Sequence, residues 1–255
     1  MVSILCSEKL GVQSYTHIVE PSREVPPEQL PSLQAAVRRL AGGEPLQYVL
    51  GCTEFLSRRF RVGQDVLIPR PETEELVRAA ITEAASRPAG VRVLDLCTGS
   101  GCIAWSIALE VPGAQVLAVD ISEKALAVAL GQFPATPRVR FETVDVLSRE
   151  DFGPTDILVS NPPYVKESEK ALMRANVLDW EPALALFVPD SDPLLFYRAI
   201  ARIARRSLSP DGWGMVEINE ALGEATAEVF RREGLREVAV HKDFCDKNRF
   251  VSFRK

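Results

Sequence analysis

The hydrophobic residues near the start of the chain recur at helical spacing. In the stretch PPEQLPSLQAAVRRLAGG, residues 26–43, the apolar positions three or four apart are Leu30, Leu33, Val37 and Leu40. This spacing predicts one apolar helix face, and the two glycines that follow end the helix. We therefore predict a helical N-terminal domain over residues 1–43, a small cap without a core of its own.

The pattern then changes to short apolar runs over residues 44–70, which favour a connecting β-hairpin or linker. Pro69 and Pro71 stiffen the chain just before the next helical pattern begins. Carboxylates in a first turn favour the positive end of the helix dipole. Those expected in this first turn are Glu72, Glu74 and Glu75.

From Arg92 onward, short apolar runs alternate with helical patterns. The strand-like runs are VRVLDL, AQVLAVD, VRFETVDV and TDILVS, and the helical ones between them are CIAWSIALEV and SEKALAVALGQF. Such alternation is typical of a parallel, doubly wound sheet. We predict an α/β domain over residues 71–255.

Two further features are predicted after these strands. Asp192 and Pro193 precede the helical run LLFYRAIARIARRSLS, so we expect Asp192 as its N-cap and Pro193 as its first residue. The final strand-like runs, REVAVHK and RFVSFRK, are expected to form an antiparallel hairpin at the sheet edge.

Composition and charge limit the choice of partner. The chain has 255 residues, 46% apolar and 25% charged, with a formal net charge of -5. This is an ordinary globular composition without a basic field to attract nucleic acid. Two arginine groups are interpreted as solvated surface: Arg58, Arg59 and Arg61, and Arg202, Arg205 and Arg206.

Cysteine and histidine usage argues against disulfides and metal. Five cysteines without a C-x-x-C pair, and only two histidines, favour neither a disulfide framework nor a zinc site. The N-terminus lacks a basic start and a long apolar core, and no window holds about 18 uninterrupted apolar residues. We expect a cytoplasmic protein without bound metal and without contact to a membrane.

The stretch VLDLCTGSGCIA places Gly99 and Gly101 between a strand and a helix. Free amides at a helix start, beside glycines that let a ligand approach, predict a small-molecule site. With Ala104 and Asp120 the stretch also satisfies a dinucleotide fingerprint. Asp95, however, would repel a pyrophosphate, whereas it would attract the α-ammonium group of S-adenosylmethionine.

The neighbouring strand ends supply further candidates. Asp120 follows the second strand and can accept hydrogen bonds from both ribose hydroxyls, while Asp145 follows the third and can take the adenine amino group. We interpret Cys97 and Cys102 as small packed residues rather than nucleophiles.

The stretch NPPY, Asn161 to Tyr164, follows the fourth strand and so opens on the same crevice. A planar amide or amino nitrogen is a poor nucleophile, and its two N–H groups can be met by the Asn161 side-chain oxygen and the Pro162 carbonyl. Prolines hold that carbonyl in place, and Tyr164 offers a ring face to a flat substrate group and to nearby positive charge. This arrangement predicts methyl transfer to a planar nitrogen.

Together with GEPLQYVLG (Gly43 to Gly51), LIPRPETEELV (Leu67 to Val77) and EPALAL (Glu181 to Leu186), these motifs resemble the HemK-like protein-(glutamine-N(5)) methyltransferases of peptide chain release factors. The resemblance implies a class I S-adenosylmethionine-dependent methyltransferase fold, Rossmann-like with a mostly parallel seven-stranded sheet. It implies an N-terminal domain that helps to dock bacterial class I release factors. We expect the protein to act as a monomer.

By the same resemblance, the cofactor-binding residues are Cys97, Thr98, Gly99, Ser100, Gly101, Asp120, Asp145, Val146 and Asn161. The target glutamine amide would lie on Asn161, Pro162, Pro163 and Tyr164, of which Asn161, Pro162 and Tyr164 are the catalytic candidates. The modified glutamine belongs to the Gly-Gly-Gln motif of the release factor.

The chain departs from the family pattern in two places. Cys97 replaces the first glycine of the usual D-L-G-T-G-x-G loop, from which we expect a negative φ at Cys97 and a slightly reshaped loop. The region before Gly43 is also shorter than is usual in the family.

Two other functions remain open at the level of sequence. NPPY also occurs in methyltransferases that act on adenine or guanine amino groups of DNA or RNA, but such an enzyme needs a basic groove that a chain of net charge -5 does not obviously supply. A nicotinamide-dependent oxidoreductase would explain the glycine pattern but leaves NPPY without a role. We therefore expect no direct binding of nucleic acid.

Overall fold

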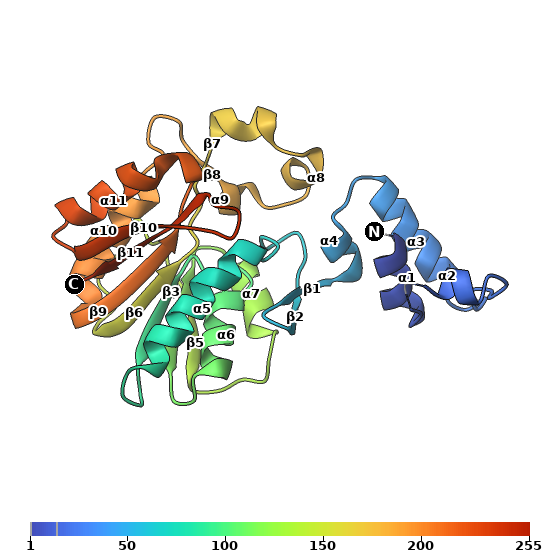
Figure 1. The fold of residues 1–255 in the computed structure, drawn as a ribbon, viewed down its shortest axis with the longest axis horizontal. Helices are drawn as coiled ribbons and strands as arrows, with labels where there is room; N and C mark the ends of the chain where they lie inside the picture. Colours follow the sequence, from blue (N-terminus) through green and yellow to red (C-terminus); the bar gives the residue numbers. More distant parts are fainter. Residues whose placement is uncertain (1, 14) are drawn as a thin grey trace.

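The computed structural model describes residues 2–13 and 15–255. Figure 1 shows a central sheet flanked by helices, with a group of small helices at one end and a short hairpin between the two. None of the helices in these described ranges has the length and apolar content needed to span a bilayer.

The N-terminal helices are α1 (Val2–Leu10), α2 (Thr16–Val19), α3 (Leu30–Ala41) and α4 (Leu46–Leu50). The predicted helix is thus present as α3. Leu33 and Leu40 pack against a separate cluster of buried residues, Leu5, Ala36 and Val49. The N-terminal helices thus share a small core of their own, which corrects the expectation, while Leu30 and Val37 stay exposed. Helix α4 falls within the residues expected to connect the two parts and was not predicted.

The predicted hairpin consists of β1 (Cys52–Phe55) and β2 (Arg58–Arg61), paired antiparallel. Its two turn residues, Leu56 and Ser57, both have positive φ values of 48° and 59°, as a tight two-residue hairpin turn requires. Phe55 and Phe60 are buried in the core beneath the sheet, which anchors the hairpin to the α/β part.

The main sheet has the order β10-β11-β9-β6-β3-β4-β5. Its strands are β3 (Arg92–Leu96), β4 (Gln115–Asp120), β5 (Val139–Thr143), β6 (Thr155–Ser160), β9 (Leu208–Glu217), β10 (Arg236–Lys242) and β11 (Asn248–Arg254). The five strands from β9 to β5 run parallel, and β11 is antiparallel to both of its neighbours. The mostly parallel seven-stranded sheet and the antiparallel hairpin at its edge are therefore confirmed.

Helices cover both faces of this sheet. One face carries α5 (Pro71–Ala85), α6 (Cys102–Glu110) and α7 (Glu123–Leu130), and the other carries α10 (Leu195–Ser207) and α11 (Gly223–Arg232). Val93 of β3 packs in the first of the two cores and Leu94, the next residue, in the second. Burial on both faces explains why these strands read as continuous apolar runs.

A long excursion separates β6 from α10 and lies above the sheet edge (Figure 1). It contains β7 (Val165–Lys166), the 3-10 helix η1 (Glu167–Leu172), α8 (Ala175–Leu178), α9 (Ala183–Leu186) and β8 (Phe187–Val188). A second 3-10 helix, η2 (Glu220–Leu222), follows β9.

The predicted start of α10 was wrong by two residues. The helix begins at Leu195, and Asp192 does not cap it. The Asp192 carboxylate is instead held by the guanidinium of Arg198, and its carbonyl accepts a hydrogen bond from the Leu195 N–H at 3.3 Å. Pro193 therefore lies in a turn that precedes the helix rather than in its first turn.

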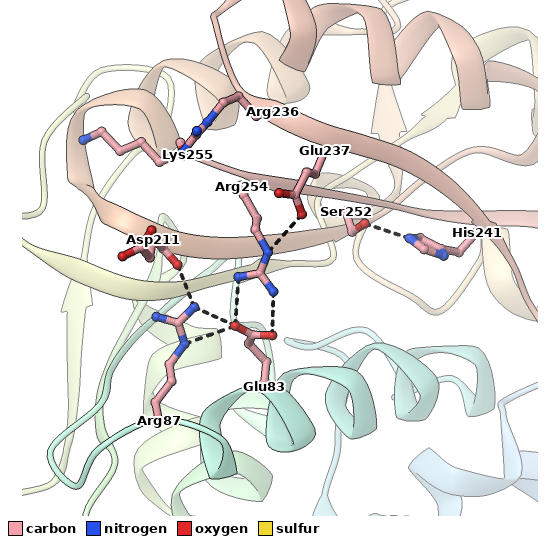
Figure 2. A network of polar contacts seen from close by, with 9 residues as sticks. All are labelled: Glu83, Arg87, Asp211, Arg236, Glu237, His241, Ser252, Arg254 and Lys255. Atoms are coloured by element: carbon pink, nitrogen blue, oxygen red, sulfur yellow. Dashed lines mark hydrogen bonds and ion pairs between the residues drawn. The ribbon is translucent and has the colours of Figure 1, made fainter.

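A polar network joins the last strand to α5 (Figure 2). The Glu83 carboxylate accepts hydrogen bonds from Arg87 at 2.6 Å and from Arg254 at 3.1 Å, and Arg254 also pairs with Glu237. Burial opposes ionisation of Glu83, but the two guanidinium groups outweigh it and lower the pKa of this carboxyl. The network therefore holds β11 against the helix that begins with the PETE segment.

Candidate active site

A cavity of about 210 Å³ opens at the carboxyl ends of the parallel strands, far more than the ~15 Å³ that one water molecule needs. The predicted residues that line it are Cys97, Thr98, Gly99, Ser100, Asp120, Asp145, Val146, Asn161 and Pro163. The predicted residues outside its lining are Gly101, Pro162 and Tyr164. The loops after four successive strands thus meet at one edge of the sheet, where ligands of such folds bind.

Cys97 has a φ of +60°, which corrects the expectation of a negative value. Hydrogen bonds on its C-terminal side hold the loop: Thr98 N–H donates to the Val119 carbonyl at 3.0 Å, and Gly99 N–H donates to the Asp120 carboxylate at 2.8 Å. Cysteine therefore adopts the left-handed conformation that suits glycine, at a steric cost of about 1–2 kcal/mol. The loop keeps this conformation in spite of the Cys97 side chain.

Both cysteines of the loop are neutral thiols. Burial, with a smaller contribution from the charge of Asp120, raises the pKa of Cys97 far above its ordinary value. Burial also raises the pKa of Cys102 to about 12. Since the thiolate is the reactive form, neither residue is prepared to act as a nucleophile.

The two loop glycines serve different purposes. A Cβ atom on Gly99, whose φ is +53°, would meet nothing within 4 Å, so this position leaves open space. A Cβ on Gly101 would lie 2.9 Å from the Cβ of Ala129 in α7 and 3.1 Å from Cδ1 of Trp105. Gly101 is thus required for close packing of α6 against α7, and Gly99 is the glycine that admits a ligand.

Asp95 lies fully buried beneath the loop. One carboxylate oxygen accepts hydrogen bonds from Thr98 Oγ1 at 2.6 Å and from Ala104 N–H at 3.2 Å. The other oxygen has no hydrogen-bond partner among the described residues. Burial raises the pKa of Asp95 to about 7, and nearby Asp120 adds to the rise. A positive group brought close to this carboxyl would therefore be stabilised.

Asp120 and Asp145 are held by backbone amides at the next two strand ends. Asp120 accepts from Gly99 N–H at 2.8 Å and from Ser122 N–H at 2.9 Å, and burial raises its pKa. Asp145 accepts from Leu147 N–H at 2.8 Å. Each carboxylate oxygen has a second lone pair, so both side chains can still accept hydrogen bonds from a ligand in the cavity.

Asn161 is tied to a helix on the same face of the sheet as the glycine loop. Its side-chain Nδ2 donates to Thr73 Oγ1 at 3.2 Å, and Thr73 Oγ1 donates to Glu217 Oε2 at 2.7 Å. The Asn161 amide oxygen points the other way and accepts no hydrogen bond from the described residues, although Asn161 lines the cavity. An acceptor is therefore available at this position.

Tyr164 is anchored behind the loop. Its hydroxyl donates to Glu217 Oε1 at 3.0 Å, its carbonyl accepts from Asn219 Nδ2 at 3.3 Å, and it packs against the core on the α10 face. Burial first, and then the charge of Glu217, raise the pKa of this hydroxyl well above its ordinary value, so it stays protonated. Pro162 and Pro163 are buried.

The sequence did not predict that the segment leading into α5 lines the cavity. Pro69 and Arg70 before the helix and Thr73 in its first turn line it, as does Leu184 of α9. Glu181, which is buried, accepts from Ile68 N–H at 3.1 Å and from Arg70 at 2.6 Å. The PRPETE and EPALAL segments are thus joined directly, but no spacing rule connects residues more than a hundred positions apart.

Comparisons with known proteins identify the family that this chain resembles. Residues 2–51 match the family model described as PrmC N-terminal domain, and residues 76–179 match the one described as Methyltransferase small domain. The chain is 44% identical over 252 residues to a release factor glutamine methyltransferase of Bacteroides thetaiotaomicron, covering 98% of this chain and 90% of the relative. It is 41% identical over 238 residues to a protein of the same name from Flavobacterium psychrophilum, covering 92% and 84%.

A solved structure is similar as well. The release factor-specific protein-(glutamine-N5) methyltransferase of Alicyclobacillus acidocaldarius is 31% identical to this chain, with a TM-score of 0.47. The match covers 77% of this chain and 99% of that chain.

Proposed function

The chain belongs to the family of release factor glutamine methyltransferases, and from this premise we propose the reaction of its cavity. The protein transfers a methyl group from S-adenosylmethionine to the side-chain amide nitrogen of a glutamine, the one in the Gly-Gly-Gln motif of bacterial class I peptide chain release factors.

The residues around the cavity fit S-adenosylmethionine. The open space at Gly99 allows a ligand to approach the backbone. Asp95 lies buried beneath the loop, outside the cavity lining, and its unpaired oxygen would attract an ammonium group bound on the loop. Asp120 and Asp145 offer acceptors for the ribose hydroxyls and the adenine amino group. The cofactor supplies an electrophilic methyl group when it is bound.

The orientation of Asn161 is the observation that carries the proposal. Because its NH2 group faces Thr73, its oxygen is free to accept from the NH2 group of the substrate glutamine. The Pro162 carbonyl is the second proposed acceptor. Both hydrogen bonds strengthen as positive charge develops on the nitrogen, so they stabilise the transition state more than the ground state.

The same contacts also fix the line of attack. The buried prolines hold the Pro162 carbonyl with little ordering cost, and Tyr164, with its hydroxyl anchored on Glu217, supports the loop from behind. Transfer leaves a positively charged substrate nitrogen, whose proton is then acidic and passes to water. No strong base has to act before the methyl group moves.

We further propose that the enzyme works as a monomer in the cytoplasm, without direct contact to nucleic acid. All five cysteines are free, which suits a reducing compartment. The net charge of -5 disfavours a nucleic-acid substrate.

The decisive experiment incubates the purified protein and labelled cofactor with three acceptors in parallel. These are an unmodified class I release factor, the same factor with its Gly-Gly-Gln glutamine replaced by alanine, and mixed DNA and RNA. We expect label only on the unmodified factor. Label on nucleic acid alone would replace the proposal with an amino-group methyltransferase.

A further inference from the structure

A series of hydrogen bonds runs behind residues 161–164, the acceptor loop, and ends on a buried carboxylate. Glu217 of β9 is 1% exposed and accepts from Tyr164 Oη at 3.0 Å through one oxygen and from Thr73 Oγ1 at 2.7 Å through the other. Thr73 in turn accepts from Asn161 Nδ2 at 3.2 Å. The residues come from β9, α5 and the loop after β6, so the series joins three separate elements.

The direction of each hydrogen bond in this series follows from the chemistry of the groups that form it. An ionised carboxylate can only accept, so the Thr73 hydroxyl must donate its single proton to Glu217. The Thr73 oxygen is then left as an acceptor for its other neighbour. Asn161 must therefore turn its NH2 group towards Thr73, and its oxygen is directed to the opposite side.

Burial raises the pKa of the Glu217 carboxyl above its ordinary value. The hydrogen bonds from Thr73 and Tyr164 and the charge of Arg249 oppose this rise and favour the ionised form. Glu72 of α5 is the nearby negative charge, and Arg249 of β11 is itself paired with Asp243 at 2.9 Å.

We propose that Thr73 and Glu217 are positioning residues for methyl transfer: the Glu217 carboxylate, acting through the Thr73 hydroxyl, holds the Asn161 amide with its oxygen towards the substrate. This inference rests on the proposed function, and it names the residues that keep the Asn161 oxygen turned towards the substrate. Without them the amide can rotate. Its NH2 group would then face the substrate NH2 group, which places two hydrogen-bond donors against each other.

The first test replaces Thr73 by valine, which keeps the shape of the side chain and removes the hydroxyl. In the release factor assay we expect Thr73→Val to lower kcat by at least ~30-fold at saturating substrates, with the Kd for S-adenosylmethionine within threefold of wild type by calorimetry. Thr73→Ser restores the hydroxyl and should return kcat to within about threefold of wild type. A merely structural role would not produce this split or this rescue.

Thr82→Val is the matched control, because it makes the same change in the same helix at an exposed threonine whose hydroxyl donates to the Arg78 carbonyl. It should leave kcat unchanged. If Thr73→Val retains kcat within threefold of wild type, or if Thr73→Ser is as slow as Thr73→Val, the inference is overturned.

Glu217→Gln provides a second route should Thr73→Val fail to fold. Glutamine can donate to Thr73 from its NH2 group, which frees the hydroxyl proton to point at Asn161 and reverses the direction of the series. We expect kcat to fall at least ~10-fold with cofactor affinity retained, and an unchanged kcat would overturn the inference.

Asn161→Ala in the same assay distinguishes failure of the positioning role from failure of the proposed function. An inactive Asn161→Ala beside a fully active Thr73→Val rejects the positioning role alone. A wild-type protein that methylates no release factor rejects the proposed function instead.

Discussion

The glycine loop, residues 97–101, and the acceptor loop, residues 161–164, lie at the same sheet edge but are held in different ways. The glycine loop is supported by Asp95 and Asp120, at the ends of β3 and β4, within about twenty residues of it. The acceptor loop depends on partners much farther along the chain. Asn161 contacts Thr73 88 residues away, and Tyr164 contacts Glu217 53 residues away.

Because the two loops have separate supports, each can be altered independently of the other. Changes around the glycine loop should affect cofactor binding and local stability. Changes in helices and strands far from the acceptor loop should alter kcat through Asn161. Four substitutions test this division.

The largest expected effect is that of Asn161→Ala on methyl transfer. We expect kcat to fall at least ~10²–10³-fold, by analogy with the loss of one transition-state hydrogen bond in a preorganised site. The Kd for S-adenosylmethionine should stay within about tenfold of wild type by calorimetry. Full activity of the purified variant would remove Asn161 from the mechanism.

The next effect concerns Asp95 and the pH dependence of stability. The unfolded carboxyl titrates near 3.8, whereas the pKa of the folded one is raised to about 7 by burial. Between these values the folded state holds the proton that the unfolded state has lost, so stability should fall as pH rises, by up to ~4 kcal/mol.

Urea unfolding without cofactor at pH 5 and pH 8 measures this fall. Asp95→Asn is neutral at both pH values and should lose less stability than wild type between them. Equal pH dependence in the two proteins would show that Asp95 is ionised in the folded state at little cost.

Asp120→Ala changes the support of the glycine loop, whereas Asn161→Ala changes the acceptor loop. We expect cofactor binding to weaken by about 1–3 kcal/mol through loss of a charge-assisted hydrogen bond. At saturating cofactor, kcat should fall much less than in Asn161→Ala. Unchanged calorimetric affinity would exclude Asp120 from the cofactor site.

The smallest effect is expected for Cys97→Gly. Glycine relieves the left-handed strain of about 1–2 kcal/mol. It also increases the entropy of the unfolded chain, which lowers the free energy of unfolding by ~0.5–1 kcal/mol. A net gain of about 0.5–1 kcal/mol in urea unfolding is the expected result. Cys97→Ala keeps the strained conformation and serves as the control, and an equal gain in that variant would assign the effect to the thiol.

The two loops also differ in how far sequence could predict them. The alternation of strands and helices and the glycine loop follow from local patterns, because Gly99 and Asp120 lie on consecutive strand ends whose spacing is visible in the chain. The contacts of Asn161 with Thr73, and of Thr73 with Glu217 144 residues later, depend on the packing of α5 against the sheet. No local pattern encodes that packing.

Two wrong predictions, the φ of Cys97 and the N-cap role of Asp192, have similar causes. The φ of Cys97 was predicted from the preference of one residue, whereas hydrogen bonds of Thr98 and Gly99 to the next strand decide it. Asp192 was predicted as an N-cap from residue type, whereas Arg198 competes for its carboxylate. In both places tertiary contacts override a local preference.

The position of β11 also sets an order of events while the protein is being synthesised. Both neighbours of β11 in the sheet, β9 and β10, precede it in the chain, so β9 remains an open edge on the ribosome until β11 follows. Phe250 of β11 pairs with Glu217, and Arg249 faces the same carboxylate. A nascent chain that stops before Asn248 already carries the whole cavity lining and the NPPY segment. In such a chain β9, which carries Glu217, still lies at an unpaired edge, and the positive charge of Arg249 is not yet beside the carboxylate.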